Sequence, residues 1–134
     1  SACKDWKVSA DTSKAPVVAA KPTTEVPTDL VQRDVTTGSG PAATADDQLT
    51  VQYKGISCSN AQQFDASWDR GEPFTFRPAD NGVIAGWIQG VIGMKVGGRR
   101  VLVIPPELGY GPAGQGPIGP NETLFFVVDL VAIG

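Results

Sequence analysis

Hydrophobic and polar residues alternate along the middle of the chain, which is the pattern of a β-strand with one buried face. Between Gln48 and Lys54, the residues Leu49, Val51 and Tyr53 fall on one side and polar residues on the other. Alternation, β-branched and aromatic content or a continuous apolar run predicts four further strands: Leu30–Val35, Phe74–Phe76, Val101–Ile104 and Thr123–Ile133. The uninterrupted apolar run of Val101–Ile104 is typical of a central strand that is buried on both faces.

The period of the pattern changes between Val83 and Val91. Four apolar residues are spaced there as on one face of a helix: Ile84, Trp87, Ile88 and Val91. Asp80 or Asn81 is a suitable N-cap, whereas Gly86 and Gly90 weaken the helix. We therefore predict one short helix that depends on packing for its stability.

The predicted elements define an α+β domain of four to six antiparallel strands and one short helix. A single helix cannot cover two faces of a sheet, so we expect the sheet to curl around it with its apolar face on the helix. The polar segment Ile56–Gln63 and the glycine- and proline-rich segment Gly109–Asn121 are predicted loops.

Residues 1–28 differ in composition from residues 29–134. They contain three prolines, no glycine and only one large hydrophobic residue, Trp6. Such a segment buries too little apolar surface to offset the entropy lost on ordering the chain. We therefore predict a flexible tether at residues 1–28, followed by a folded domain at residues 29–134.

The two cysteines, Cys3 and Cys58, allow three interpretations. They are unrelated thiols, or they form a disulfide, or Cys3 carries a lipid. The third interpretation follows from Ser1-Ala2-Cys3, which resembles the end of a bacterial lipobox and precedes a segment rich in proline, threonine and alanine. It implies lipidation of Cys3 and an extracytoplasmic location at a bacterial cell membrane or envelope, with the lipid anchor as the only membrane contact.

Composition excludes several classes of function. The chain has 134 residues, a formal net charge of −3 and no histidine. Without histidine there is no Ser-His-Asp or Cys-His nucleophile, no histidine general base and no histidine-containing zinc site. We expect no metal and no cofactor. No basic surface is indicated, so nucleic acid is not an expected partner, and no apolar run approaches the roughly 20 residues of a membrane-spanning helix.

Two local motifs are misleading. Residues 109–114 match the pattern G-x-G-x-x-G, but a dinucleotide-binding loop must open a helix, which Pro112 and the prolines that follow prevent. Asp65 and Asp69 resemble paired catalytic carboxylates, yet Arg70 follows them directly. We expect a structural ion pair there.

Aromatic residues beside predicted loops form the constellation that carries chemistry. They come from strand ends, from the helix and from the long loop: Tyr53, Phe64, Phe74, Trp87, Tyr110 and Phe126. If the sheet curls around the helix, these side chains converge at one mouth of the core. A concave aromatic site with few polar groups is suited to an apolar ring.

The order of short motifs in residues 29–134 resembles the FKBP family of macrolide-binding peptidyl-prolyl cis–trans isomerases. The motifs are VQYKG at 51–55, FDAS at 64–67, PFTF at 73–76, VIAGW at 83–87, GV at 90–91, MKVGG at 94–98, IPP at 104–106, YG at 110–111, Ile118 and TLFF at 123–126. Two loops depart from the small single-domain members: the segment 54–63 is one residue longer, and the segment 111–122 is one residue shorter and richer in glycine.

The resemblance implies a curled antiparallel sheet of five or six strands around one short helix, and a pocket whose floor is Trp87. The other substrate-binding residues would be Phe64, Phe74, Val83, Ile84 and Ile118, and the catalytic residues would be Tyr53, Asp65, Tyr110 and Phe126. By the same resemblance, the backbone N–H of Ile84 and the hydroxyl of Tyr110 contact ligand carbonyls, and Arg70 pairs with Asp65.

The resemblance also implies a peptidyl-prolyl cis–trans isomerase that assists protein folding as a monomer, with X–Pro-containing polypeptides and macrolides as partners. Rotation about an X–Pro bond is slow because it breaks amide resonance, and it needs no proton transfer or covalent intermediate. An apolar pocket lowers the barrier, since the planar amide is more polar than the twisted one. Two alternatives are a proline-peptide-binding chaperone or adaptor with little turnover, and a tethered surface protein whose aromatic residues are only structural.

Overall fold

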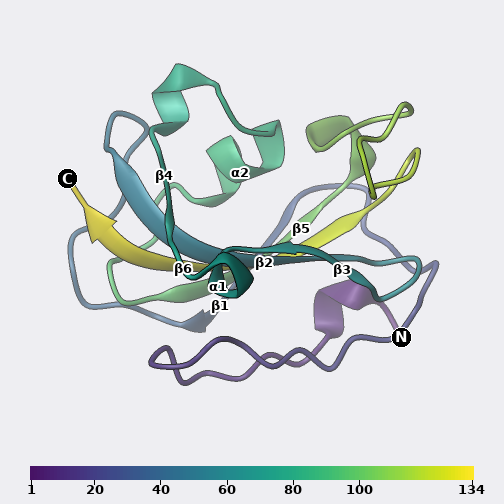
Figure 1. The fold of residues 1–134 in the computed structure, drawn as a ribbon, viewed down its shortest axis with the longest axis horizontal. Coiled ribbons are helices and arrows are strands. Elements are labelled where there is room, and N and C mark those ends of the chain that lie inside the picture. Colours follow the sequence, from purple (N-terminus) through teal and green to yellow (C-terminus); the bar gives the residue numbers. More distant parts are fainter.

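A six-stranded antiparallel sheet forms the framework of the protein, as described by a computed structural model of residues 1–134. The strands are β1 (Val31–Thr36), β2 (Leu49–Ser57), β3 (Gln63–Ala66), β4 (Phe74–Phe76), β5 (Arg99–Ile104) and β6 (Leu124–Ile133). The helices are α1 (Ser67–Arg70) and α2 (Ala85–Gly90), with 3₁₀ turns at Cys3–Asp5, Pro78–Asp80 and Pro106–Leu108. The strand order is β1-β5-β6-β2-β3, and β4 pairs with the other end of β2. The α+β fold with a curled sheet beside a short helix is confirmed (Figure 1).

All five predicted strands are present, but the sheet contains more than the pattern indicated. β2 continues to Ser57 because β6 pairs with it as far as Leu124, so the first part of the predicted loop Ile56–Gln63 is strand. The short strand β3 and the single turn α1 were not predicted. β3 has only four residues, two of them polar, and its pairing with β2 shifts register after Gly55, so there is no run of regular alternation long enough to mark a strand.

The helix α2 begins later than predicted and lacks the predicted cap. Its N-cap is Ile84, whereas Asn81 has a φ of 57° and ends the preceding 3₁₀ turn. A Cβ atom at Gly86 would lie 2.5 Å from Ile104, and one at Gly90 would lie 2.6 Å from Leu102. The two glycines that weaken the isolated helix therefore let it approach β5 closely.

The sheet is covered on both faces. The cluster on the α2 side includes Tyr53, Trp87 and Phe126. The cluster on the opposite side includes Trp6, Val101 and Phe125. Every residue of β5 is buried, as predicted for a central strand.

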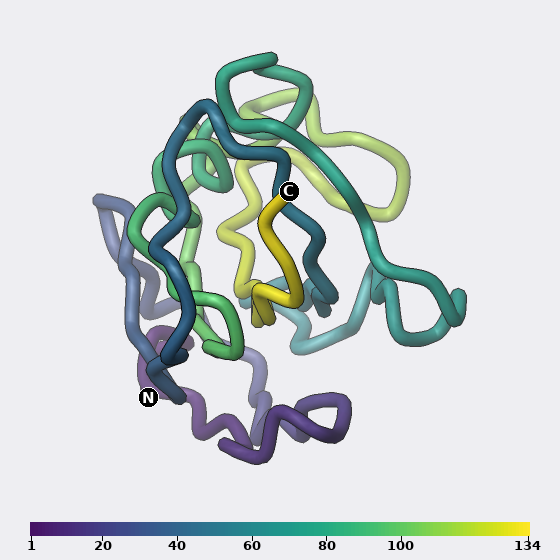
Figure 2. Tube along the Cα trace, turned by 90° about the vertical axis from the view of Figure 1, so that its left-hand side faces the viewer, coloured from purple at the N-terminus to yellow at the C-terminus, as the bar shows by residue number.

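Residues 1–28, called the N-terminal arm below, form the layer on that opposite side, which corrects the predicted flexible tether. Figure 1 shows the purple arm on the side of the sheet away from α2, and Figure 2 shows it following the lower side of the molecule. Trp6 is only 3% exposed, and its ring centroid lies 4.9 Å from that of Phe125. Val8 and Val18 pair as an antiparallel bridge, so part of the arm folds back on itself.

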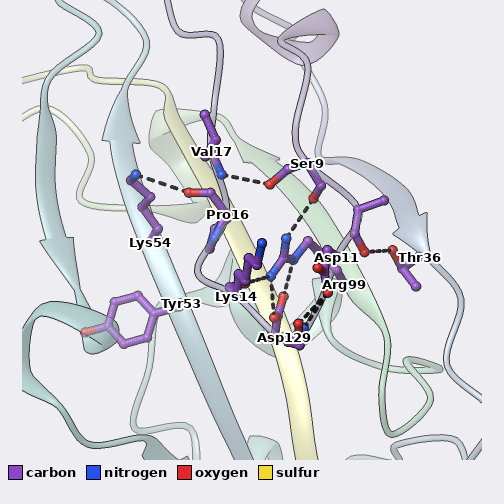
Figure 3. Close-up of polar contacts among 12 residues, drawn as sticks. Ser9, Asp11, Lys14, Pro16, Val17, Thr36, Tyr53, Lys54, Arg99 and Asp129 are labelled. Atoms are coloured by element: carbon purple, nitrogen blue, oxygen red, sulfur yellow. Dashed lines mark hydrogen bonds and ion pairs between the residues drawn. The ribbon is translucent and has the colours of Figure 1, made fainter.

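Side-chain donors on the sheet hold the main chain of the arm (Figure 3). The fully buried guanidinium of Arg99 donates to the carbonyl oxygens of Ser9 at 2.7 Å and Lys14 at 2.6 Å, and to the carboxylate of Asp129. Thr36 donates to the carbonyl of Ala10, Lys54 to that of Pro16, and Arg33 to those of Lys4 and Trp6. Ordering the arm costs conformational entropy, which the few apolar residues of the arm do not offset alone. These hydrogen bonds supply further stabilisation of the ordered arm.

Cys3 forms a disulfide with Cys58, which directly follows β2, and both residues are fully buried. Of the three interpretations of the cysteines, this structure contains the disulfide. Lipidation of Cys3 needs the same sulfur atom, so the predicted lipid at Cys3 is corrected here. Separately, no helix in the structure is both long and apolar enough to cross a membrane.

Candidate functional site

An open cavity of about 230 Å³ lies on the α2 side of the sheet. Its lining brings together Tyr53, Phe64, Asp65, Phe74, Gly82, Val83, Ile84, Trp87, Tyr110 and Phe126. Apart from Asp65 and Gly82, these residues are aliphatic or aromatic. Nine of the ten residues that the sequence placed at the site therefore lie around one cavity.

The lining residues come from elements that are distant in sequence. Tyr53 is on β2, Phe126 on β6 and Phe74 on β4, while Phe64 and Asp65 are on β3. Val83 to Trp87 enter at the start of α2, and Tyr110 follows the turn after β5. Because β2 pairs with β3, β4 and β6, it brings the walls of the cavity together.

Trp87 is the centre of the aromatic cluster and is 4% exposed. Its ring lies nearly perpendicular to those of Tyr53 and Phe126, with centroid separations of 5.0 and 5.4 Å. Phe74 approaches it at 6.0 Å, also edge-on. Such pairs contribute about 0.5–1.5 kcal/mol each beyond the burial of their area. The floor of the cavity is therefore held rigidly from three sides.

A polar cluster closes one edge of the cavity. The hydroxyl of Tyr53 donates to Asp65, Arg70 donates to the other oxygen of Asp65, and Arg70 Nη2 donates to Tyr53 Oη at 2.9 Å. The guanidinium also lies 5.5 Å from the centre of the Tyr53 ring. Asp69 accepts instead from Gln63, at 2.7 Å. The predicted Asp65–Arg70 ion pair is confirmed, and the two aspartates do not share a site.

Burial raises the pKa of the Tyr53 phenol, and the hydrogen bond to Asp65 raises it further. The pKa of Arg70 is also raised, chiefly by its hydrogen bond to Tyr53. Tyr53 therefore stays protonated at neutral pH and Arg70 stays charged. The hydrogen bonds from Tyr53 and Arg70 engage both carboxylate oxygens of Asp65 and so orient the carboxylate.

Among the hydrogen-bond donors of cavity-lining residues that have no partner in the protein are the hydroxyl of Tyr110 and the backbone N–H of Ile84. The pKa of Tyr110 is raised by burial and by the charge of Asp65, with no hydrogen bond contributing. The backbone N–H of Ile84 makes no backbone hydrogen bond, because Ile84 is the N-cap of α2 and no helical carbonyl precedes it, while its own carbonyl accepts from the N–H groups of Trp87 and Ile88. Both groups can donate to a carbonyl oxygen bound in the cavity.

Ile118 is the predicted site residue that the structure does not place in the cavity lining. It is 7% exposed, and it packs into the core cluster on the α2 side. Its backbone exchanges two hydrogen bonds with Gln115, at 2.8 and 2.9 Å, which form a tight turn in the shortened loop. That turn directs Ile118 into the core.

Two residues that support the site were missed by sequence reasoning. Gly82 contributes only backbone, which leaves no side-chain signal. Ser67 is fully buried, accepts a hydrogen bond from the Tyr53 N–H at 2.7 Å and donates to Gln52 Oε1 at 2.6 Å. Ser67 is the last residue of the FDAS motif, and its place in that motif is the signal that could have identified it.

Known proteins resemble this chain in sequence. The sequence model of the FKBP-type peptidyl-prolyl cis-trans isomerase family matches residues 40–131. The FK506-binding protein of Streptomyces anulatus is 52% identical over 111 residues, which are 81% of this chain and 90% of that protein. The probable FK506-binding protein of Corynebacterium glutamicum is 46% identical over 111 residues, or 83% of this chain and 92% of that protein.

Solved structures resemble it in fold. The crystal structure of FkpA from Escherichia coli matches with a TM-score of 0.72 and 44% identity, over 84% of this chain and 50% of that one. The crystal structure of AtFKBP13 matches with a TM-score of 0.74 and 36% identity, over 81% of this chain and 96% of that one. Fold, cavity and sequence agree, and the chain belongs to the family of FKBP-type peptidyl-prolyl cis–trans isomerases.

Proposed function

We propose that the cavity around Trp87 binds the proline ring of X–Pro segments in unfolded polypeptides and accelerates rotation about the preceding amide bond. The observation that carries this proposal is the enclosure of one small cavity by Tyr53, Phe74, Trp87 and Phe126. A pyrrolidine ring is compact and apolar, and it matches a floor formed by an indole with phenyl walls.

Desolvation supplies the rate enhancement. Rotation must overcome a barrier of about 18–20 kcal/mol, because the planar amide is stabilised by resonance. Resonance makes the planar amide more polar than the twisted one, so transfer from water into the aromatic cavity disfavours the planar ground state more than the transition state. Each tenfold in rate needs only about 1.4 kcal/mol of this difference.

The two unpartnered donors orient the bound segment. The hydroxyl of Tyr110 and the N–H of Ile84 hold carbonyl oxygens of the substrate on either side of the rotating bond. Because burial raises the pKa of Tyr110, its hydroxyl remains a donor at neutral pH. Asp65, held by Tyr53 and Arg70, shapes the edge of the cavity and contributes an oriented negative charge without transferring a proton.

The same cavity is proposed to bind macrolides, which would compete with the peptide. We further propose that the protein acts as a monomer, since the ten lining residues of a single chain are enough to form the floor and walls of the cavity. The proposed setting is extracytoplasmic, since a disulfide such as Cys3–Cys58 persists in oxidising compartments. Newly exported polypeptides are then the proposed clients, and no lipid on Cys3 is part of the proposal.

The test is a protease-coupled assay in which only the trans isomer of an X–Pro peptide is cleaved. We expect the full chain to accelerate the slow phase and a macrolide to abolish the acceleration. Trp87→Leu should remove most of the activity, whereas Trp68→Leu, on α1 outside the cavity lining, should retain it. Peptide binding without acceleration would overturn the proposal in favour of a binding module.

A further inference from the structure

Gly55 occupies the middle of β2 between two strands that carry site residues. Its Cα is in register with Phe126 of β6 on one side and with Asp65 of β3 on the other. Its φ is not positive, so the backbone itself does not require glycine there. A glycine in the interior of a central strand weakens the strand, and it often marks a place where another group approaches the backbone closely.

The group that approaches Gly55 is a pair of aromatic rings. A Cβ atom at residue 55 would lie 2.6 Å from Cζ of Phe64 and 2.8 Å from Cε1 of Phe126, closer than real contacts allow. The two rings meet there edge-to-face, with centroids 5.5 Å apart and planes at 88°. The edges of both rings therefore occupy the space that a side chain at residue 55 would need.

The rings of Phe64 and Phe126 both line the cavity, and the ring of Phe126 also packs against Trp87, which forms the cavity floor. The ring of Phe126 stands perpendicular to that of Trp87, at 5.4 Å. Phe126 is 4% exposed and is fixed by its surroundings, whereas Phe64 is only partly buried and has room to move. The steric clash caused by a methyl group at residue 55 would therefore be relieved mainly by movement of the Phe64 side chain.

Other glycines of the chain are also closely packed, but against different partners. Gly86 and Gly90 lie against Ile104 and Leu102, which belong to the core beneath α2 and do not line the cavity. Gly55 is the one glycine whose missing Cβ is replaced by two cavity-lining rings.

We propose that Gly55 is a positioning residue for the isomerisation: its lack of a side chain sets how closely Phe64 and Phe126 close over β2, and so sets the width of the cavity. This inference rests on the proposed function of the cavity. It assigns the role to a position that carries no reactive group.

The test is a double-mutant cycle between Gly55→Ala and Phe64→Leu, read as kcat/KM on an X–Pro peptide. We expect Gly55→Ala alone to lower kcat/KM about tenfold, while in the Phe64→Leu background it lowers kcat/KM less than about threefold. Leucine lacks the Cζ and Cε1 atoms of Phe64 that the new methyl group meets, and the remaining contact with Phe126 Cε1 accounts for the residual loss. Gly119→Ala is the matched control, since a Cβ there meets open space and φ is not positive. It should leave kcat/KM unchanged.

Equal losses from Gly55→Ala in the two backgrounds, or full activity of Gly55→Ala alone, would overturn the inference. If Gly55→Ala fails to fold, the double variant still decides: it should regain the fold and measurable activity, and failure to do so counts against the role of Phe64. If the wild type does not accelerate isomerisation, the proposed function fails first. The cycle is then read from the affinity for the X–Pro peptide, measured by tryptophan fluorescence, where the same non-additivity is expected.

Discussion

Phe125 and Phe126 are neighbours on β6, yet their rings lie on opposite faces of the sheet. The ring of Phe125 contacts Trp6 of the N-terminal arm at 4.9 Å, and the ring of Phe126 stands at 5.4 Å from Trp87 in the cavity. Because successive side chains of a strand point to opposite faces of the sheet, Phe125 contributes to the attachment of the arm and Phe126 to the site.

This relationship predicts a separation of stability from activity. Phe126→Leu should lower kcat/KM about tenfold, the equivalent of about 1.4 kcal/mol of transition-state stabilisation, through loss of a cavity wall. Phe125→Leu should lower the free energy of unfolding by about 1–2 kcal/mol and leave kcat/KM of the folded protein nearly unchanged. Urea unfolding and the peptide assay measure the two effects. Equal losses of activity in both variants would contradict the assignment.

The disulfide should stabilise the fold without contributing to the chemistry. Cys3 and Cys58 are separated by 55 residues. In the chain-entropy model, a cross-link that closes a loop of that size raises the free energy of the unfolded state by about 4 kcal/mol, because it lowers the entropy of the unfolded chain. Replacing both cysteines by serine should therefore lower the free energy of unfolding by about 2–4 kcal/mol, with kcat/KM at 25 °C largely retained. The native protein should show no free thiol on alkylation. A lipid found on Cys3 by mass spectrometry would contradict this arrangement.

How far the sequence specifies this fold depends on where the stabilising energy comes from. The strands around Val51, Val103 and Val127 were predicted because their burial is visible in the local sequence, as alternation, as a continuous apolar run or as β-branched and aromatic content. The packed arm was not, because its stability comes from residues far along the chain: Arg99 donates to carbonyls about ninety residues earlier, and Cys58 closes the disulfide. Main-chain carbonyls carry no sequence signal, so only Trp6 hinted at this attachment.

The gathering of the candidate site residues around one cavity was predictable for a related reason. Its side chains are large aromatic residues in recognisable motifs, and the order of those motifs gave their places around the cavity. Ile118 lies in the loop whose length departs from the family, where alignment by position is least secure. Gly55 belongs to a recognised motif, but the meaning of its missing side chain depends on rings from β3 and β6 that only the structure brings together.

Ser67 is expected to matter through a single buried hydroxyl. It accepts the hydrogen bond of the Tyr53 N–H at a point of β2 that pairs with neither β3 nor β4. Ser67→Ala leaves this buried N–H unpaired and should cost about 1–3 kcal/mol of unfolding free energy. Ser59→Ala is the matched control, because Ser59 is exposed and bonds only to Glu122, and its effect should stay within about 0.5 kcal/mol. Thermal or urea unfolding of the two variants distinguishes the positions.

The raised pKa values of Tyr53 and Tyr110 predict how the protein responds to alkaline pH. An unfolded tyrosine titrates near pH 10, as judged from peptides, whereas burial raises the pKa of both phenols in the folded protein. The unfolded chain therefore releases these protons first. The stability that the two neutral phenols contribute is fully present below the unfolded value, and it is lost as pH rises through the higher folded values. Tyr53→Phe and Tyr110→Phe should each flatten part of this alkaline loss.

The raised pKa of Tyr110 also predicts how the activity depends on pH. With no histidine in the chain and Tyr110 protonated well past neutrality, kcat/KM measured by NMR exchange of an X–Pro peptide should be flat between about pH 6 and 9, since a group with a raised pKa does not change charge there. Tyr110→Phe should lower kcat/KM by about tenfold at every pH in that window, because the lost hydrogen bond to the substrate carbonyl is worth about 1–1.5 kcal/mol. A bell-shaped profile centred near neutral pH would instead require a proton-transferring group in the cavity, and it would contradict isomerisation by desolvation and hydrogen bonding alone.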